Sequence, residues 1–574
     1  METPEQGEVD EGTAEKNATP IDWPQCIEED CIGVQAPEKD RCLGHLEFRE
    51  RYELLQRGLT EIDLRGVQAD SVLVGRVIAA LPVTGDNIRL AEDCRFDHAT
   101  FINSVHFRRV QFAGSCTFRN LTTRDLLSFG YCRFEPRFAV MFSDCSLAKG
   151  ISISDTGFAG RMFLANSRAE ALSVSIKNSQ FDNDLTILGL SGEYLFVDNC
   201  SGSGLSVQGC EHRLASLTNL EFETIAVGAL SLEESFLLTQ AVAAKAGLGE
   251  ITAKEHVLVD HCELGGTENI GLLKAGDSVR VRRTTLTTRR SIACESRVLD
   301  LSDTRFIDGV TIAASAGSIV LDETHYGRSA LIVCSAPDGQ PLLLSARRAD
   351  LQNLSLDNVD LTDCAFTNAH NLDALRLQRA TFAPSPSGLA ASPVKAITKR
   401  RVLLEERLWR SRAGSQGWPT VEGADDAPDA AEIAALYRSL RSGLETARNE
   451  PGAADFYYGE MEMRRHDRNA PRAERAILRT YWALSGYGLR ASRSLAALVL
   501  LIFLAALGFW AVGFQGGHPS SFWPALTYAT GAATLHPPAR HLTTSGEALS
   551  IAFRVIGPAL LGLAAFSVRG RVRR

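Results

Sequence analysis

The sequence lacks the motifs that mark most cofactor-binding and hydrolytic enzymes. Its 574 residues include no Gly-x-Gly-x-x-Gly segment after a strand pattern and no Gly-x-x-x-x-Gly-Lys-Ser/Thr phosphate loop. A Gly-x-Ser-x-Gly strand-to-helix elbow is also missing. The 13 cysteines never form a Cys-x-x-Cys pair, which weakens a thiol-redox interpretation. We therefore predict no catalytic residue and no organic cofactor.

Positive charge is not in excess either. The net charge is −9, whereas a general nucleic-acid binder shows a basic face, so we do not expect nucleic acid as a partner. The first residues, METPEQGEVDEGTAEKN, lack the basic and apolar regions of a secretory signal. We expect a disordered acidic tail over residues 1–20. Because most cysteines sit singly in apolar patterns, we expect reduced, buried thiols in a cytosolic body.

One group of cysteines has the spacing of a metal site. The stretch CIEEDCIGVQAPEKDRCLGHL supplies Cys26, Cys31, Cys42 and His45, as Cys-x4-Cys and then Cys-x2-His. Such N/S ligands suit tetrahedral zinc, and four protein ligands leave no open position, so the zinc would be structural. A helix starting near Cys42 would place Cys42 and His45 on one face. The sequence predicts a zinc knuckle plus helix over residues 21–58; the alternative is ordinary cysteines in a loop.

The strongest pattern is an internal repeat. Residues 349–368, ADLQNLSLDNVDLTDCAFTN, divide into four five-residue units. The middle residue of each unit is large and apolar, and the residue two before it is mostly small or compact. Sets with this spacing start at 105, 127, 151 and 174, and again at 257, 279, 299 and 319, for example Leu127/Phe129/Phe134 and Ile151/Ile153/Phe158. The register is unclear over about 195–256 and 326–349.

This repeat does not give the 3.6-residue stripe of a helix. It fits a four-sided coil of short strands, whose stacked turns bury a continuous apolar column. The repeat resembles the pentapeptide-repeat family, which implies a mainly β fold, a right-handed quadrilateral β-helix, over residues 59–385. The alternative, a leucine-rich repeat, needs an inward Asn and an outer helix. The equivalent positions hold Cys132, Thr156, Ser179, Cys262, Thr284 and Thr304 instead, which favours the β-helix.

The resemblance to pentapeptide repeats implies no single chemistry. Some members of the family mimic duplex DNA through an acidic surface. Here VRVRRTTLTTRR and SARRAD place arginines among the repeats, which argues against that role. We expect a scaffold or docking surface for a protein partner that the sequence does not identify.

A helical part follows the repeat. We expect a basic helix and a flexible acidic linker over residues 386–430. An αα-hairpin over residues 431–485 is indicated by apolar residues at helical spacing, interrupted by Pro451 and Gly452. We interpret Glu460 and Glu462 as parts of a packed amphipathic hairpin rather than an active site.

Two segments near the C-terminus are apolar enough to span a membrane. Residues 494–514 are uncharged and long enough for the hydrocarbon core, and residues 547–568 form a second candidate that contains Arg554. Basic residues lie before the first segment and after the second (Arg490, Arg493, Arg569, Arg571, Arg573 and Arg574). This charge bias predicts a multi-pass inner-membrane protein with both termini in the cytoplasm.

The residues between these spans, FWPALTYATGAATLHPP, are too few and too broken to cross. Together with the spans, over residues 486–574, they resemble the two-transmembrane potassium-channel pore. Phe522, Trp523 and Thr530 resemble the pore helix of that family, and Gly557 with Pro558 resembles its hinge.

The resemblance fails at the filter. The Thr-Val-Gly-Tyr-Gly filter is replaced by TLHPP, which contains Thr534 and His536, so potassium selectivity is not implied. Either the domain conducts without that filter, or it keeps the shape without conduction, or it is an unrelated hairpin anchor. A shared pore would need about four subunits, and hence a homotetramer.

The order of the parts suggests a bacterial-type membrane protein whose cytosolic β-helix senses or docks a partner. A channel-like domain with a degenerate filter would receive the signal and conduct ions. The first alternative is a non-conducting, membrane-tethered interaction scaffold. The second is a membrane-associated oxidoreductase that uses the scattered thiols.

Overall fold

The computed structural model describes residues 21–85, 87–135, 139–168, 174–267, 270–288, 291–335, 339–386, 400–515 and 521–572. Residue contacts divide the chain into two units, residues 1–212 and 213–574, which we describe in turn. The acidic tail predicted over residues 1–20 lies outside the described residues. Coils of a parallel β-solenoid run over residues 89–378, about 13 turns in all, and form much of both units.

The first unit begins with helices α1 (Phe48–Gln56) and α2 (Ser71–Ala79) among short strands. Its strands are β1 (Ile62–Asp63), β2 (Gln68–Ala69), β3 (Val83–Thr84), β4 (Ile88–Ala91), β5 (Cys94–Arg95), β6 (Thr100–Phe101), β7 (Val105–Arg108), β8 (Val110–Phe112), β9 (Cys116–Arg119), β10 (Thr122–Thr123), β11 (Leu127–Gly130), β12 (Arg133–Phe134), β13 (Val140–Ser143), β14 (Ser146–Leu147), β15 (Ile151–Ser154), β16 (Gly157–Phe158), β17 (Met162–Ala165), β18 (Val174–Lys177), β19 (Gln180–Leu188) and β20 (Ser191–Gln208).

The second unit contains further coils and then helices. Its strands are β21 (Glu211–Gly228, whose first two residues belong to the first unit), β22 (Leu230–Leu232), β23 (Ser235–Leu248), β24 (Ile251–Ala253), β25 (His256–Asp260), β26 (Glu263–Thr267), β27 (Leu272–Ala275), β28 (Ser278–Arg282), β29 (Thr285–Thr288), β30 (Ser291–Asp300), β31 (Arg305–Phe306), β32 (Val310–Val320), β33 (His325–Tyr326), β34 (Ala330–Cys334), β35 (Leu342–Ser345), β36 (Leu354–Asp357), β37 (Arg376–Gln378), β38 (Ala383–Pro384) and β39 (Arg401–Val402). Its helices are α3 (Leu404–Arg412), η1 (Ala424–Asp426), α4 (Ala430–Thr446), α5 (Glu450–His466), α6 (Arg472–Ser485), α7 (Ala491–Gly508), η2 (Phe509–Gly513), α8 (Trp523–Ala533) and α9 (Thr544–Val572).

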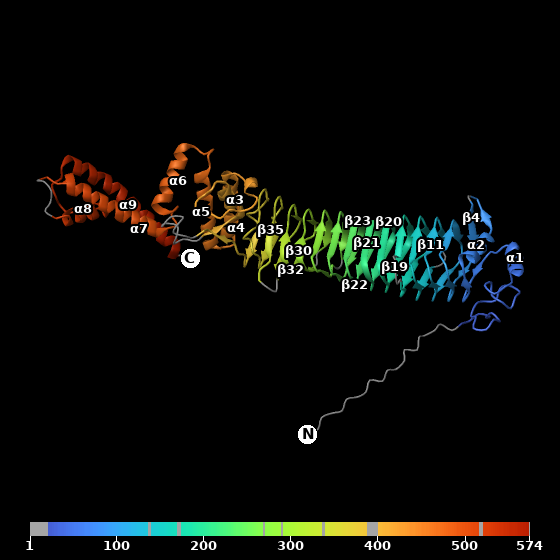
Figure 1. Cartoon of the computed structure of the whole chain (residues 1–574). Helices are drawn as coiled ribbons and strands as arrows, with labels where there is room; N and C mark the ends of the chain where they lie inside the picture. The colour runs from blue at the N-terminus through green and yellow to red at the C-terminus, as the bar shows by residue number, and fades with distance from the viewer. Residues whose placement is uncertain are drawn as a thin grey trace, which may run out of the picture. The chain divides into compact units, whose positions relative to one another are not determined.

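Within the first unit, successive coils lie directly on one another (Figure 1). One coil supplies the four strand segments β11, β12, β13 and β14, and the next coil begins with β15, which pairs in parallel with β11. Leu127 lies opposite Ile151 and Phe129 opposite Ile153, as the repeat predicts. The predicted four-sided coil of short strands is therefore confirmed here.

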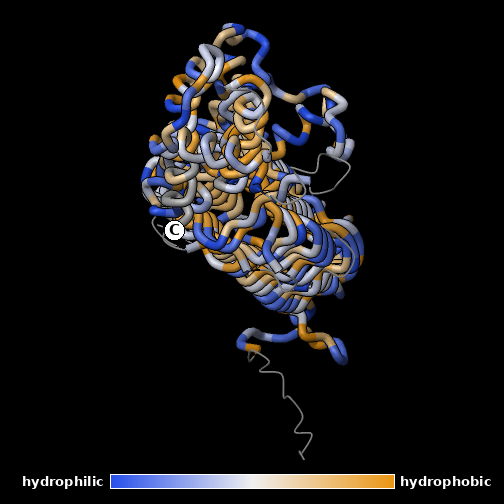
Figure 2. Tube along the Cα trace, turned by 90° about the vertical axis from the view of Figure 1, so that its left-hand side faces the viewer, coloured by the Kyte–Doolittle hydropathy of each residue, from blue (hydrophilic) through white to orange (hydrophobic). Residues whose placement is uncertain are grey.

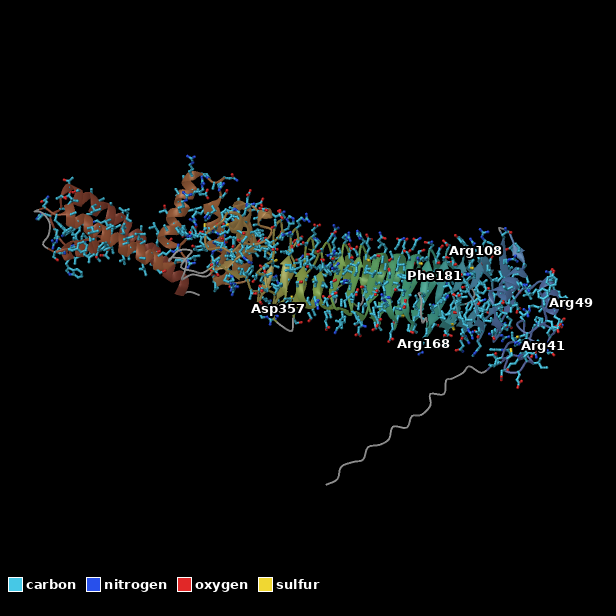
Figure 3. The ribbon with its side chains drawn as sticks, viewed as in Figure 1. Arg41, Arg49, Arg108, Arg168, Phe181 and Asp357 are labelled. Carbon is cyan, nitrogen blue, oxygen red and sulfur yellow. The ribbon has the colours of Figure 1, made fainter. Side chains whose placement is uncertain are left out.

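Aromatic side chains at equivalent positions stack along the inside of this unit. The ring centroids of Phe118 and Phe142 are 4.2 Å apart with ring planes at 6°, and those of Phe158 and Phe181 are 4.9 Å apart, also at 6°. Each buried aromatic ring removes about 150–250 Å² from water, so the stacks supply much of the driving force for coiling. Phe181 lies within the ribbon, whereas Arg108 and Arg168 are exposed on its outside (Figure 3).

The corners of the coil explain the cysteines, threonines and serines of the repeat. A residue in the left-handed conformation, such as Asp155 (φ 50°) or Asn178 (φ 49°), precedes the inward-pointing corner residue. The hydroxyl of that corner residue donates across the turn, as Thr156 Oγ1 does to the carbonyl of Ser154 at 2.8 Å. Asn and Asp tolerate the left-handed conformation better than other non-glycine residues. Because no helix lies among the described residues of 89–378, the leucine-rich alternative is wrong.

The five-residue spacing continues where the sequence register was unclear. In the second unit, Ala215, Leu217, Leu220, Phe222, Ile225 and Val227 are all buried. These residues lie on the 18-residue strand β21, which continues around the corners where earlier coils are interrupted. The signal fades in the sequence because alanine occupies several inward positions, among them Ala241, Ala243 and Ala246. Both hydrophilic and hydrophobic residues occur along the tube (Figure 2).

Helix α3 covers the last coils of the second unit. Glu405 is buried and accepts hydrogen bonds from the backbone N–H of Phe366 and from Thr367 Oγ1. Arg407 Nη1 donates to Asp363 Oδ1 at 2.6 Å. The helix thus satisfies polar groups that a bare solenoid end would leave open.

The buried Glu405 gives a pH-dependent prediction. Burial raises the pKa of Glu405, although the N–H of Phe366 opposes the change. The folded state then binds more protons than the unfolded state, so stability is lost as pH rises from the unfolded carboxyl pKa, about 4.3, through the raised folded pKa. Denaturant unfolding from pH 4 to 8 should show that this loss is smaller in Glu405→Gln. The exposed carboxyl variant Glu422→Gln should behave as wild type; identical pH profiles for Glu405→Gln and wild type would contradict the assignment.

Two helical segments are long and apolar enough to cross a membrane, Ser492–Gly513 on α7 and η2, and Thr544–Leu563 on α9. Helix α8 lies between them in the sequence and has 11 residues, a length of about 16 Å. That is roughly half of the ≈ 30 Å hydrocarbon core. One face of α8, made of alanines and Tyr528, packs on α7, η2 and α9. Phe509 of η2 and Phe553 of α9 belong to this buried cluster. The three helices α7, α8 and α9 lie together in Figure 1.

Candidate metal centre and buried charge network

A short hairpin in the first unit carries the first two ligand candidates. Gln25 and Val34 form an antiparallel bridge, and the N–H of Cys26 donates to the carbonyl of Gly33 at 2.7 Å. This hairpin returns Cys31 to the side of Cys26. Gly33 favours close approach, because a Cβ there would lie 3.0 Å from the Cβ of Cys42.

The other two candidates lie on a single turn. Helix α1 begins at Phe48, later than the predicted start near Cys42. The carbonyl of Cys42 nevertheless accepts from the N–H groups of His45 at 2.9 Å and Leu46 at 3.1 Å. This turn places the side chains of Cys42 and His45 next to one another, so the predicted pairing holds without the predicted helix.

The structure brings all four predicted ligands together. The ligand atoms of Cys26, Cys31, Cys42 and His45 all lie within 4.8 Å of one another. His45 Nδ1 is 3.5 Å from the Sγ atoms of both Cys26 and Cys42, and the Sγ atoms of Cys31 and Cys42 are 3.9 Å apart. Tetrahedral zinc, with Zn–S near 2.3 Å and Zn–N near 2.0–2.1 Å, requires S···N separations of about 3.5 Å and S···S separations of about 3.8 Å. The four residues could therefore hold a metal ion of that size.

Backbone N–H groups point at the thiols of this cluster. Cys42 N–H donates to Cys26 Sγ at 3.3 Å, and Gly33 N–H donates to Cys31 Sγ at 3.4 Å. Burial raises the pKa of Cys26, but hydrogen bonds led by the Cys42 amide outweigh it and lower this pKa to about 7. Burial raises the pKa of Cys42 to about 12. A metal would supply the positive charge that a second buried thiolate needs.

The hairpin is fastened to the first strands of its unit. Val34 N–H donates to the carbonyl of Arg65 at 2.8 Å. Within the hairpin, the indole N–H of Trp23 donates to the carbonyl of Ile32 at 2.9 Å. The guanidinium of Arg65 lies 5.0 Å from the Trp23 ring centroid. Arg41 and Arg49 are exposed or half-exposed side chains at this end of the unit (Figure 3).

The thiols of the solenoid differ from those of the hairpin. Burial raises the pKa values of Cys132, Cys145, Cys200 and Cys262 to about 11. Cys145 Sγ donates to the carbonyl of Phe118 at 2.9 Å. Reactive cysteines need an accessible thiolate, so these four are structural, and their environment argues against thiol-redox chemistry.

A second polar cluster, in the helical part of the second unit, is absent from the sequence-based prediction. Glu406 is fully buried and accepts from Arg400 at 2.5 and 2.7 Å, from Arg410 at 2.9 Å and from the Tyr437 hydroxyl at 2.7 Å. Burial raises the pKa of Glu406, but the charges of Arg400 and Arg410 outweigh it and hold this pKa at about 2.

Glu462 extends this cluster toward the first apolar helix. It accepts from Arg410 at 3.2 Å, from Arg465 at 2.6 Å and from the hydroxyl of Tyr487 at 3.1 Å. We call the whole set the buried charge network: Arg400, Glu406, Arg410, Tyr437, Glu462, Arg465 and Tyr487. The network joins α3, α4 and α5 to the segment that connects α6 with α7. The Glu406–Arg410 spacing is a visible signal, but it is equally typical of an exposed helix face.

No protein-family model matches the chain, and comparison with curated proteins and with solved structures gives no match either. Geometry and chemistry therefore carry the functional assignment.

The predicted pore-like residues lie just before, on and after α8. Phe522 is partly buried, whereas Trp523 is 68% exposed. Thr530 is exposed, and its hydroxyl donates to the carbonyl of Leu526 at 2.8 Å. Thr534 and His536 are exposed in the single chain. Side chains that line a pore in an assembly are exposed in one isolated subunit, and Trp523, Thr530, Thr534 and His536 meet that condition.

The predicted hinge residues lie on α9. Gly557 is buried against the end of α8, since a Cβ there would lie 2.7 Å from the Cα of Ala533. Pro558 follows inside the helix. After α8 the chain folds back tightly on Gly531, where a Cβ would lie 2.6 Å from the carbonyl oxygen of His536. Close contact through small residues is typical of membrane helices.

Proposed function

We propose that the protein is a membrane-anchored scaffold or sensor. Its solenoid, similar to pentapeptide repeats, acts on the cytosolic side and is joined through α3–α6 to a two-span, channel-like domain. The observation that carries this proposal is the packing of α8, too short to span, against two helices that are long and apolar enough to cross. A re-entrant helix held between two spans is the arrangement of channel pore domains.

The solenoid supplies a surface rather than a reaction centre. Its outer faces carry opposite charges on neighbouring coils, such as Lys274 and Glu295 at 2.8 Å. Such stacked repeats give extended binding surfaces, which supports docking of a protein partner. The proposed orientation, with both termini in the cytoplasm, rests on Arg490 and Arg493 at the start of the first span and on the basic residues after the second.

In this proposal Cys26, Cys31, Cys42 and His45 hold a structural zinc ion. The separations of their ligand atoms support zinc, and a complete set of protein ligands gives the metal no substrate position. Zinc would fix the hairpin of residues 21–46 on the first strands of its unit.

The second candidate is the same anchored scaffold without conduction. It is favoured by Pro537 and Pro538, which stand where channel filters place glycine. Carbonyl groups of a filter point at the ion because glycine permits left-handed backbone, and here Leu535 adopts that conformation instead (φ 63°). The left-handed conformation is uncommon for leucine.

The native mass of the full-length protein in detergent micelles, followed by ion flux from liposomes, separates these candidates. A shared pore requires a tetramer and flux that changes in Thr534→Ala and His536→Ala, with His541→Ala as the matched exposed control. A tetramer without flux would favour the non-conducting scaffold. A monomer would contradict the pore, and a protein that is soluble without detergent would contradict the membrane assignment.

A further inference from the structure

A pocket in the second unit lies beside the buried charge network and the start of α7. Its lining includes four arginines and two tryptophans: Arg400, Arg410, Arg490, Arg493, Trp418 and Trp482. The cavity measures about 50 Å³. One water molecule needs about 10–15 Å³ on the same measure, so the pocket has room for a small tetrahedral group.

The charges of this pocket do not balance. Glu462 is the only carboxylate among its described lining residues. Arg400 and Arg410 are already paired with Glu406. In the part of the chain that the structure describes, no carboxylate lies within ion-pair distance of Arg490 or Arg493. The pocket therefore keeps an excess of positive charge.

Arg490 and Arg493 are held in place by aromatic rings instead. The Arg490 guanidinium lies 5.1 Å from the Tyr458 ring centroid, and that of Arg493 lies 5.1 Å from the Trp482 ring centroid. Arg493 Nη1 also donates to the carbonyl of Trp482 at 3.2 Å. A guanidinium has five N–H donors, so both side chains retain donors for a ligand.

The surroundings of Arg490 disfavour an unaccompanied cation. Burial lowers the pKa of Arg490, and the charges of Arg493 and Arg400 act in the same direction, although Tyr458 and Asp455 oppose them. A bound anion would relieve both effects. Arg490 is also the N-cap of the 18-residue helix α7, whose N-terminal N–H groups and dipole favour negative charge.

We propose that this pocket binds a phosphate group. Guanidinium forks match the oxygens of phosphate and bind them through paired, charge-assisted hydrogen bonds. Two lining residues of the pocket, Arg490 and Arg493, lie at the start of the first candidate span, which begins at Ser492. An anionic lipid would present its headgroup phosphate at this position. Free inorganic phosphate has the same chemistry, so the experiment must distinguish the two sources.

The test uses the full-length protein in detergent and isothermal titration with two probes, inorganic phosphate and dioctanoyl phosphatidic acid. Dioctanoyl phosphatidylcholine is the zwitterionic comparator. We expect the phosphatidic acid to bind more tightly than the phosphatidylcholine. Arg490→Gln and Arg493→Gln should each weaken this binding about tenfold, the usual effect of losing a charge-assisted hydrogen bond. Arg493→Lys, which keeps the charge, should weaken binding less than Arg493→Gln.

Arg479→Gln is the matched control. Arg479 is exposed on α6 and lies outside the pocket, and its substitution by Gln removes the same single positive charge. Tight binding of phosphatidic acid alone identifies a lipid headgroup, and competition by inorganic phosphate identifies a free anion; either result supports the site. Absence of binding by both probes, or equal weakening in Arg479→Gln and the pocket variants, overturns it. The measurement requires neither conduction nor a tetramer, so its failure is distinct from failure of the proposed function.

Discussion

Replacing Glu406 by alanine is expected to lower the free energy of unfolding of the helical part by about 3–5 kcal/mol. The side chain of Glu406 is 0% exposed, and those of its partners Arg400 and Arg410 are 6% and 7% exposed. Removing the carboxylate leaves buried Arg400 without its paired carboxylate, whereas Arg410 keeps Glu462, and the Tyr437 hydroxyl loses its acceptor. Denaturant unfolding in detergent, followed by tryptophan fluorescence, measures the change because Trp409 and Trp418 lie beside Arg410.

The control for Glu406→Ala is Glu445→Ala on α4. The side chain of Glu445 is 56% exposed, and Glu445 pairs with Arg441 at 3.5 Å; exposed pairs contribute about 0–1 kcal/mol. A companion variant that replaces Arg400, Glu406 and Arg410 together by apolar residues should recover much of the loss, since the penalty comes from uncompensated charge. A loss below about 1 kcal/mol in Glu406→Ala, within the range of an exposed pair, would contradict the network's role as a stabilising junction.

The solenoid could be predicted because its information is local. Each five-residue unit carries its own inward residues. A set such as Leu127, Phe129 and Phe134 therefore predicts a coil without knowledge of the rest of the chain. The prediction weakened where alanine replaced large inward residues, as at Ala243 and Ala246. There the contrast between inside and outside disappears from the sequence, although parallel pairing with the preceding coil persists.

The cluster of candidate metal ligands was predicted for a related reason. Cysteine and histidine are so specific as ligands that four of them at suitable spacing stand out, even though the helix expected near Cys42 begins at Phe48. The buried charge network was not predicted, because Glu and Arg are most often exposed. Arg410 and Glu462 are hydrogen-bonded although they lie 52 residues apart in the sequence. Helical periodicity identifies the apolar face of each helix, but it does not show which helix faces pack together.

The largest local effect is expected from loss of the proposed zinc. The purified protein should contain equimolar metal, and Cys26→Ser combined with Cys42→Ser should abolish it. Structural zinc contributes about 10–16 kcal/mol of apparent binding free energy in small domains. Without it, the two buried thiols and His45 have no common partner. The hairpin then depends on bonds at its edges, such as that of Val34 N–H to the carbonyl of Arg65 and those of Arg51 to the carbonyls of Gly44 and Leu46. We expect residues 21–46 to become sensitive to protease while the coils that follow remain resistant.

The matched control is Glu28→Ala in the same hairpin. The side chains of Glu28 and Arg41 are each 41% exposed and pair at 2.8 Å, so their separation should change neither metal content nor protease resistance. Chelation of wild type should reproduce the double cysteine variant, and added zinc should reverse the chelated state but not the variant. If metal-free wild type keeps the hairpin resistant, the cluster is not a structural metal site, and amide hydrogen bonds such as Cys42 N–H to Cys26 Sγ are sufficient to hold it.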